Sequence, residues 1–242
     1  MVADPIPGRC EVLLSSIIFD IAAVLLLLEF TSIGYGFPMA KDDLTGWNWL
    51  GCWSCVGWFI GFALLIDWTV FSTFPVWGFS RQALAGATLK LIASVLFCIQ
   101  PFSYLAGFDP LNAGNPWSNF VGICFFHAGN MLNAICMCPM IDCSAPLLAN
   151  APPIGMIIFA TATWFLVIAD GIFYFALPTP SGPGVDVRSA IDVVSPFQVT
   201  GATLLLVGSL LYTFWAAMFA RVKESEALLA SMPAETVNAQ LP

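Results

Sequence analysis

Long apolar segments, separated by short polar connections, organise this chain. Six of the segments are each long enough for the roughly 20 residues that cross a hydrocarbon core of about 30 Å. They extend over Val12–Tyr35, Trp47–Phe71, Ala83–Ala106, Trp117–Met140, Pro153–Leu177 and Gln198–Ala220. A backbone in lipid must satisfy its own hydrogen bonds, and the segments lack the alternating pattern of barrel strands. The predicted fold class is therefore all-α, a polytopic membrane bundle of six transmembrane helices.

One stretch of the pattern occurs twice. LAGATLKLIASVLF at 84–97 and VTGATLLLVGSLLY at 199–212 share seven of fourteen aligned letters. An apolar span precedes each copy and ends on an acid, Asp67 in the first case and Asp170 in the second. Three spans per half is an odd number, so a duplicated half re-enters the membrane from the opposite side, as in many secondary transporters. The alternative is chance similarity between two leucine-rich segments.

This duplication predicts a 3+3 inverted-topology repeat. The first repeat covers 1–116 and the second covers 117–221, and residues 222–242 form a polar C-terminal tail that begins as a solvated helix. The connection at 178–196 is rich in proline and glycine, so it is predicted to be a short interfacial helix or a lid.

The composition agrees with a bilayer environment. Apolar residues make up 59% of the 242 residues and charged residues 9%, whereas about a quarter of the residues in soluble domains are charged. The net charge is -8 and there is no lysine or arginine cluster to neutralise phosphates, which excludes nucleic acid as an expected partner. The expected partners are the lipid bilayer and either a second copy of the chain or a membrane complex.

The few cations predict an orientation. With six spans, Lys41 and Arg188 fall on one side of the membrane. The side of the termini carries four cations, Arg9, Arg81, Arg221 and Lys223. The positive-inside rule therefore predicts that both termini are cytoplasmic.

Ionisable side chains inside a bilayer are costly and mark candidate functional sites. At 1.5 Å per residue, Asp20, Lys90 and His127 reach a similar depth and are predicted to share a layer near the midplane. Lys90, whose repeat counterpart is Leu205, is expected to pair with Asp20 or Asp67, either as a structural tie or in a proton relay. The candidate polar site residues are Asp20, Lys90, His127, Asp67, Asp170 and Asn130. Glu29 also lies in an apolar span, nearer its end, and Asn130 belongs to a stripe with Cys124, His127 and Asn133 that is expected to face one polar seam.

The sequence carries little further chemistry. Cys136, Cys138, Met140 and Cys143 are soft ligands of the type that suits Cu(I), although such residues also pack membrane cores. No metal or other cofactor is predicted from them. The chain lacks GxSxG, HExxH, Walker and GxGxxG motifs, so we do not expect an enzyme.

The hairpins that contain GATLKLIASVLF and GATLLLVGSLLY resemble the YrhK-like family of small membrane modules, over Trp47–Phe97 and Gly155–Tyr212. The resemblance implies a duplicated helical membrane hairpin and no particular activity. From the architecture we expect a transporter or channel for a small solute or ion, with a midplane polar site and with proton coupling as one option. The alternative is a non-catalytic scaffold or accessory subunit of a membrane complex.

Overall fold

The computed structural model describes residues 9–41, 44–71, 81–105, 116–144, 150–176 and 187–231. Its long helices are α1 (Arg9–Tyr35), α2 (Leu44–Phe71), α3 (Arg81–Leu105), α4 (Pro116–Met137), α5 (Ala151–Gly171) and α6 (Val187–Ser231). A 3₁₀ turn, η2 (Cys138–Met140), extends α4, and a π-helical turn, η3 (Ile172–Ala176), extends α5. These described residues contain no strand, which confirms the predicted all-α class.

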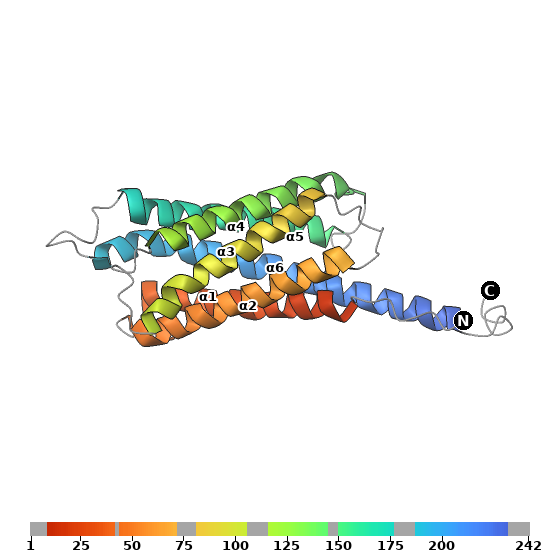
Figure 1. Ribbon diagram of the computed structural model, residues 1–242, viewed down its shortest axis with the longest axis horizontal. Coiled ribbons are helices and arrows are strands. Elements are labelled where there is room, and N and C mark those ends of the chain that lie inside the picture. The colour runs from red at the N-terminus through yellow and green to blue at the C-terminus, as the bar shows by residue number, and fades with distance from the viewer. Residues whose placement is uncertain are drawn as a thin grey trace.

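The six helices form a closed ring. Each helix packs against the helix before it and the helix after it in the chain, and α6 closes the ring against α1. Consecutive helices run in opposite directions, so that α1 begins and α6 ends at the same end of the bundle (Figure 1). Each helix in this ring therefore contacts two neighbouring helices and directs one face outward.

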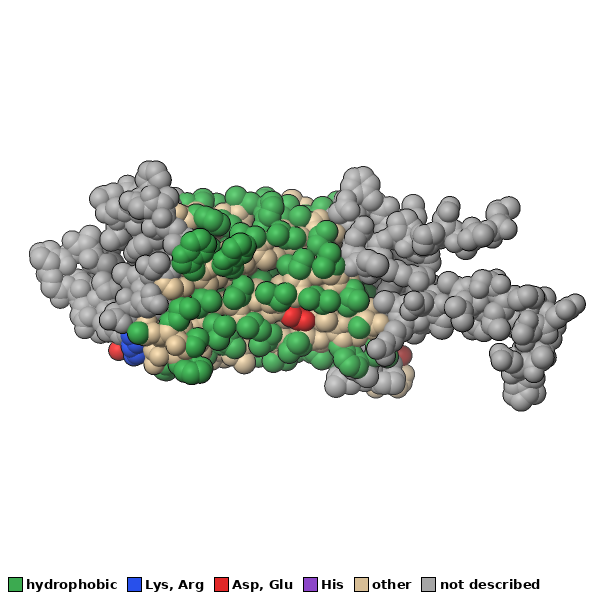
Figure 2. Space-filling model, turned by 90° about the horizontal axis from the view of Figure 1, so that it is seen from below, with side chains coloured by type: hydrophobic (Ala, Val, Ile, Leu, Met, Phe, Trp, Pro, Cys, Tyr) green, Lys and Arg blue, Asp and Glu red, His purple; other side chains and the backbone are tan. Residues whose placement is uncertain are grey.

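Five of the described helices are long and apolar enough to cross a membrane, namely α1, α2, α4, α5 and α6. The apolar part of α3 is shorter, Leu84–Ile99, since Arg81 and Gln82 precede it and Gln100 follows it. Apolar side chains cover the middle of the described surface in Figure 2, with an acidic side chain among them. The multi-pass membrane character is therefore supported, and the crossing by α3 stays a prediction.

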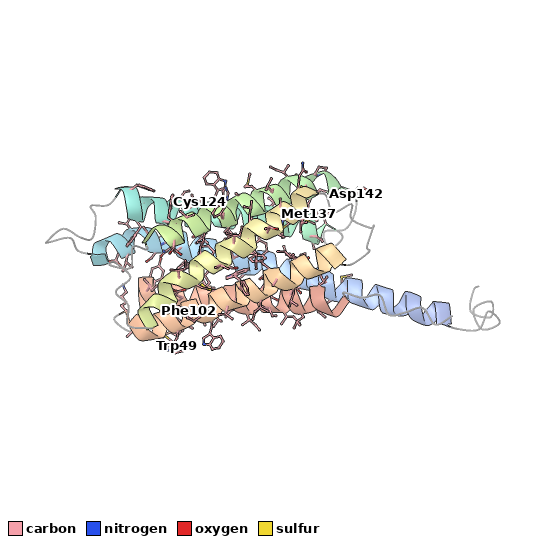
Figure 3. The ribbon with its side chains drawn as sticks, in the orientation of Figure 1. Trp49, Phe102, Cys124, Met137 and Asp142 are labelled. Atoms are coloured by element: carbon pink, nitrogen blue, oxygen red, sulfur yellow. The ribbon has the colours of Figure 1, made fainter. Side chains whose placement is uncertain are left out.

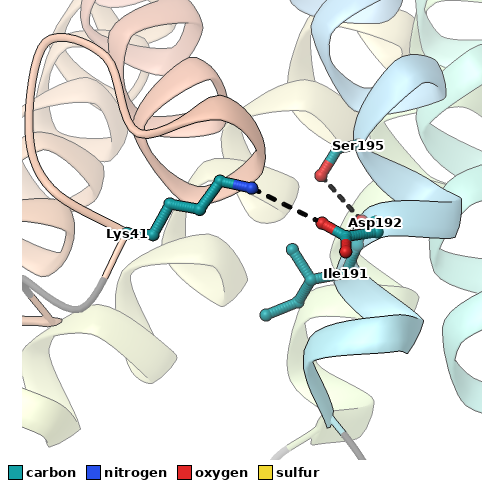
Figure 4. A network of polar contacts seen from close by, with 4 residues as sticks. All are labelled: Lys41, Ile191, Asp192 and Ser195. Carbon is teal, nitrogen blue, oxygen red and sulfur yellow. Dashed lines mark hydrogen bonds and ion pairs between the residues drawn. The ribbon is translucent and has the colours of Figure 1, made fainter.

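Helix α6 is longer than the sequence pattern predicts. It begins at Val187 and passes through Pro196, so part of the predicted connection at 178–196 is the first part of a long helix. Pro196 cannot donate to the carbonyl of Asp192, one turn earlier. The Ser195 hydroxyl donates to the Ile191 carbonyl at 2.7 Å, and Asp192 forms an ion pair with Lys41 at 3.7 Å (Figure 4). At its other end, α6 projects past the bundle (Figure 1).

An aromatic cluster fills the centre of the ring. The ring centroids of Phe19 and Phe62 lie 4.7 Å apart, those of Trp58 and Phe126 lie 5.6 Å apart, and those of Trp58 and Phe159 lie 6.4 Å apart. These five side chains come from α1, α2, α4 and α5, and each is at most 5% exposed. The helices are therefore joined at their centre by apolar contacts.

The ends of the bundle carry side chains suited to an interface. Figure 3 shows Trp49 and Phe102 toward one end, and Met137 and Asp142 toward the other. Trp49 is 49% exposed and Phe102 is 44% exposed. Exposed tryptophan near a span end is typical of the headgroup level.

The repeated stretch has the same pattern of exposure in both copies. At each of the thirteen positions from 84 to 96, the residue is buried, half-buried or exposed in step with its counterpart from 199 to 211. The buried members are Gly86, Ala87, Lys90, Ala93 and Ser94 in α3, and Gly201, Ala202, Leu205, Gly208 and Ser209 in α6. The alignment of letters and the buried face of each helix therefore agree in register.

Candidate functional site

Asp20 lies at the interface of α1 and α6. Its Oδ2 accepts a hydrogen bond of 2.7 Å from the Thr213 hydroxyl. Its Oδ1 is buried and has no hydrogen-bond partner. The carboxyl group is thus held by one helix neighbour, with one oxygen left over for a further donor or a cation.

His127 lies on the other side of the ring, between α4 and α5. Its Nδ1 is 2.9 Å from the Thr163 hydroxyl, and its ring lies 4.6 Å from that of Trp164. Thr163 Oγ1 also lies within hydrogen-bond distance of the Phe159 and Ala160 carbonyls. If the threonine proton goes to a carbonyl, Nδ1–H is the donor to Thr163, and Nε2 of His127 is the free acceptor.

Asp170 is the second-to-last residue of α5, which the π-helical turn follows. It is 8% exposed, and its Oδ2 accepts a hydrogen bond of 2.9 Å from Asn119 on α4. A Cβ built on the next residue, Gly171, would meet nothing within 4 Å. Single π-helical turns occur frequently at functional sites. This carboxyl group is therefore buried within the protein.

Lys90 reaches from α3 into the interior of the ring. It is 2% exposed, and its Cγ lies 2.8 Å from the position of a Cβ built on Gly129, so its stem lies against α4. Its Nζ is 5.2 Å from the centroid of the Phe62 ring on α2. An ammonium over an aromatic face gains a favourable cation–π interaction. The Lys90 side chain thus ends next to the central aromatic cluster.

Asn130 faces the interior from α4. One neighbour, Gly129, meets α3, and His127, three residues earlier, meets α5. The direction of Asn130 lies between these two faces of the helix. Its side chain is 1% exposed, and its Nδ2 is buried without a hydrogen-bond partner.

The structure does not assemble the predicted midplane site as one cluster. Asp20 binds a threonine of α6 and His127 binds a threonine of α5, so the two groups serve different helix interfaces. One of the two partners expected for Lys90, Asp20, accepts a hydrogen bond from Thr213. Equal depth along two helices does not fix their rotation, so the shared layer near the midplane stays a prediction. The side chain of Asp67 lies outside the described residues.

The predicted stripe on α4 divides among several directions. Asn133 approaches Gly86 on α3, His127 binds α5, and Asn130 points between them. Cys124 is half-buried. A spacing of three residues falls short of a full turn of 3.6, and this difference accumulates along the stripe.

The residues that contact the acidic groups on α1 and α5 were not predicted from the sequence. Glu29 lies against α2, where a Cβ on Gly51 would come 2.7 Å from its Oε1. Asn119 is the donor to Asp170, and Thr213 is the donor to Asp20. Asn119, Thr213 and Gly51 carry no distinguishing motif, because their importance arises from contacts between segments far apart in the chain.

The cysteine-rich segment does not form a metal centre among the described side chains. Cys136 Sγ contacts Gln82 Oε1 at 3.5 Å, whereas Cys138 and Cys143 are exposed. No group of three or more His, Cys, Asp or Glu residues suited to a metal ion is found in the described ranges. The side chain of Met140 lies outside them.

Comparison with known proteins adds no family, because no family model, curated protein or solved structure matches the chain. The resemblance to YrhK-like modules therefore stays a prediction that rests on the two GATL-containing hairpins alone.

Proposed function

We propose that this protein is a membrane transporter or channel for a small solute or ion, with its polar site inside the ring of helices. The observation that carries the proposal is the pair of buried polar atoms without partners, Asp20 Oδ1 and Asn130 Nδ2. Buried polar groups in folded proteins are nearly always hydrogen-bonded, and an unsatisfied one is costly. Such groups are accounted for if a solute, an ion or water occupies the interior during the functional cycle.

The architecture supports the same proposal. We propose that α1–α3 and α4–α6 are inverted repeats, because α1 and α4 run in opposite directions and the repeated stretches of α3 and α6 match in exposure. Inverted repeats carry transport sites near their interface. In this arrangement both termini face the cytoplasm, in accord with the cations at that end.

A second function has one observation in its favour. Helix α6 continues to Ser231, although its candidate span ends at Met218, and it projects beyond the bundle (Figure 1). A projecting helix can bind a partner, as a scaffold or accessory subunit requires. In that case the polar contacts of Asp20, His127 and Asp170 would serve only to tie helices together.

Flux through liposomes containing the purified protein separates the two functions. Swelling of the vesicles is followed by light scattering in gradients of sodium chloride, sodium nitrate and glycerol, and proton movement is followed with an enclosed pH dye. We expect flux of at least one solute above that of empty vesicles, and at least a tenfold reduction in Asp20→Asn or Asn130→Ala. Thr88→Ala, on the exposed face of α3, is the control and retains the flux. Folded protein without flux in any gradient would contradict transport by this chain alone.

A further inference from the structure

The α4–α5 pair carries a histidine in the middle of a candidate span. His127 is the tenth residue of Ser118–Met137, about 14 Å from either end of that span at 1.5 Å per residue. Its side chain is half-buried, and the indole of Trp164, which contacts its ring, is 51% exposed. The two rings therefore lie together at a surface that a bilayer covers near its midplane.

The hydrogen bonds of His127 leave one ring nitrogen unused. Its Nδ1 is 2.9 Å from the Thr163 hydroxyl, and that hydroxyl also lies 3.0 and 3.1 Å from the carbonyl oxygens of Ala160 and Phe159. A threonine hydroxyl within a helix can donate to a carbonyl three or four residues earlier, and then Nδ1–H donates to Thr163 and Nε2 is an acceptor. This Nε2 has no hydrogen-bond partner among the described residues.

The unused nitrogen is accessible from outside the protein. Among the described side chains, the buried polar atoms without a partner are Asp20 Oδ1 and Asn130 Nδ2. Nε2 of His127 lacks a described partner and is not one of these buried atoms, so it reaches the accessible surface. A ligand can therefore approach Nε2 without an internal cavity. Hydrocarbon supplies no donor, and an acceptor left without one in the bilayer is costly.

Trp164 is unusual for its depth. Tryptophan is enriched at the two interfaces of a bilayer, where its polar N–H group meets water. Trp164 lies seven residues before the end of the candidate span Ala151–Gly171, about 10 Å from that end. Its exposed indole offers an aromatic stacking surface beside the Nε2 acceptor of His127.

These features select a ligand that dissolves in the bilayer and carries a hydroxyl group on an aromatic ring. The polar groups of a phospholipid lie about 15 Å from the midplane, which is half the thickness of the hydrocarbon core. Acyl chains reach the midplane but carry no donor. A quinol with an apolar tail meets each condition, because its ring can stack on an indole, its hydroxyl can donate to an imidazole, and its tail stays in the bilayer.

We propose that His127 and Trp164 form the binding site of a lipid-soluble quinol on the outer face of α4 and α5. Nε2 of His127 accepts the hydrogen bond from the quinol hydroxyl, and Trp164 packs against the quinol ring. Thr163 accepts from Nδ1–H and so holds the imidazole in the tautomer that makes Nε2 an acceptor. This site is separate from the interior polar site proposed for transport, so either can stand without the other.

The test measures the binding of a tritium-labelled benzoquinol with a decyl tail to the full-length chain in phosphatidylcholine nanodiscs. Dithionite keeps the ligand in its quinol form, and empty nanodiscs give the background from partitioning into lipid. We expect saturable binding above this background. The dimethyl ether of the same quinol is expected to bind at least tenfold more weakly, because it has no hydroxyl to donate to Nε2.

Variants assign the site. His127→Phe, which keeps a ring without an acceptor, is expected to weaken quinol binding at least tenfold. Trp164→Leu is expected to weaken it at least threefold, and Trp164→Phe, which keeps an aromatic ring, to restore most of that loss. Trp53→Leu is the matched control, because Trp53 is a similarly exposed tryptophan, at 58%, within the candidate span of α2, and this variant retains binding. If His127→Phe does not fold, the ether and the Trp164 variants still decide the question.

Three outcomes would overturn the inference. They are binding that does not saturate above the lipid background, equal binding by His127→Phe and the parent, or tighter binding of the quinone than of the quinol, since a quinone has no donor. A second copy of the chain on this face is detected from the size of the assembly in the nanodisc. A dimer that His127→Phe converts to a monomer, together with no quinol binding, would assign the face to a subunit contact and remove the inference.

Discussion

The repeated stretches of α3 and α6 have the same pattern of exposure and different neighbours. In α3, Gly86 meets Asn133 and the Gly129 carbonyl of α4. In α6, the aligned Gly201 meets Leu166 and the Ala162 carbonyl of α5. One copy thus packs against a polar helix face and the other against an apolar one. A shared buried face can therefore carry different chemistry, and the difference is concentrated at Lys90 and its counterpart Leu205.

The largest expected effect comes from replacing Leu205 by lysine, which gives the second copy the same residue as the first copy at this position. Leu205 is 0% exposed within the central apolar cluster. Leu205→Lys is expected to lower the free energy of unfolding by about 3 kcal/mol, because a charge placed inside a membrane protein costs about that much on insertion scales. Equilibrium unfolding in mixed micelles, followed by circular dichroism, measures the change.

Leu205→Met is the matched control for this substitution. It conserves volume and polarity, so a loss below about 1.5 kcal/mol is expected. If the lysine and methionine variants unfolded alike, the second half would tolerate a buried cation as the first half does. The contrast between the two copies would then be lost.

The aligned glycines give the next effect. A Cβ on Gly86 would meet the Asn133 amide and come 2.8 Å from the Gly129 carbonyl oxygen. A Cβ on Gly201 would come closest, at 2.8 Å, to a terminal methyl group of Leu166, and the Ala162 carbonyl oxygen would lie farther away, at 3.0 Å. A leucine methyl can rotate away, but a helix backbone cannot. Gly86→Ala is therefore expected to cost about 2 kcal/mol and Gly201→Ala less than about 1 kcal/mol, by overpacking offset by helix propensity.

Stability of the two alanine variants is compared in the same micelles. Equal losses in the free energy of unfolding would mean that the α3–α4 contact adjusts to an added methyl group as readily as the α5–α6 contact does. A smaller loss for Gly86→Ala than for Gly201→Ala would contradict the packing described for α3 and α4.

Much of the fold follows from the pattern of apolar positions, and much of the site does not. Twenty-odd apolar residues between polar connections identify each helix, and the candidate span in α1 coincides with the predicted Val12–Tyr35. The length of α6 was underestimated because a proline such as Pro196 usually indicates a helix boundary. In a long packed helix, a proline can remove one backbone hydrogen bond without ending the helix. The ring order was not predicted, because apolar residues surround each helix and give no strong preference for a neighbour.

Polar partners were harder to predict than polar candidates. Asp20, His127 and Asp170 stand out in apolar segments, but the residues that bind them, Thr213, Thr163 and Asn119, do not. Each pair joins residues more than 30 positions apart, and its formation depends on the rotation of both helices. The energetic cost of a charge in the bilayer therefore marks a candidate side chain in the sequence. Only the packing of the helices identifies the residue that binds it.

The smallest effect is expected where the two copies agree in both exposure and contacts. Thr88 and Thr203 are exposed, and each hydroxyl donates to the carbonyl four residues earlier in its own helix, at 2.9 and 2.7 Å. Replacing either by alanine removes a local bond and raises helix propensity, so both variants are expected to stay within about 0.5 kcal/mol of the parent. The same unfolding measurement in micelles checks the pair. A loss above about 1 kcal/mol in one variant alone would mean that its threonine is covered by another subunit, so that the outer faces of α3 and α6 would differ as their inner faces do.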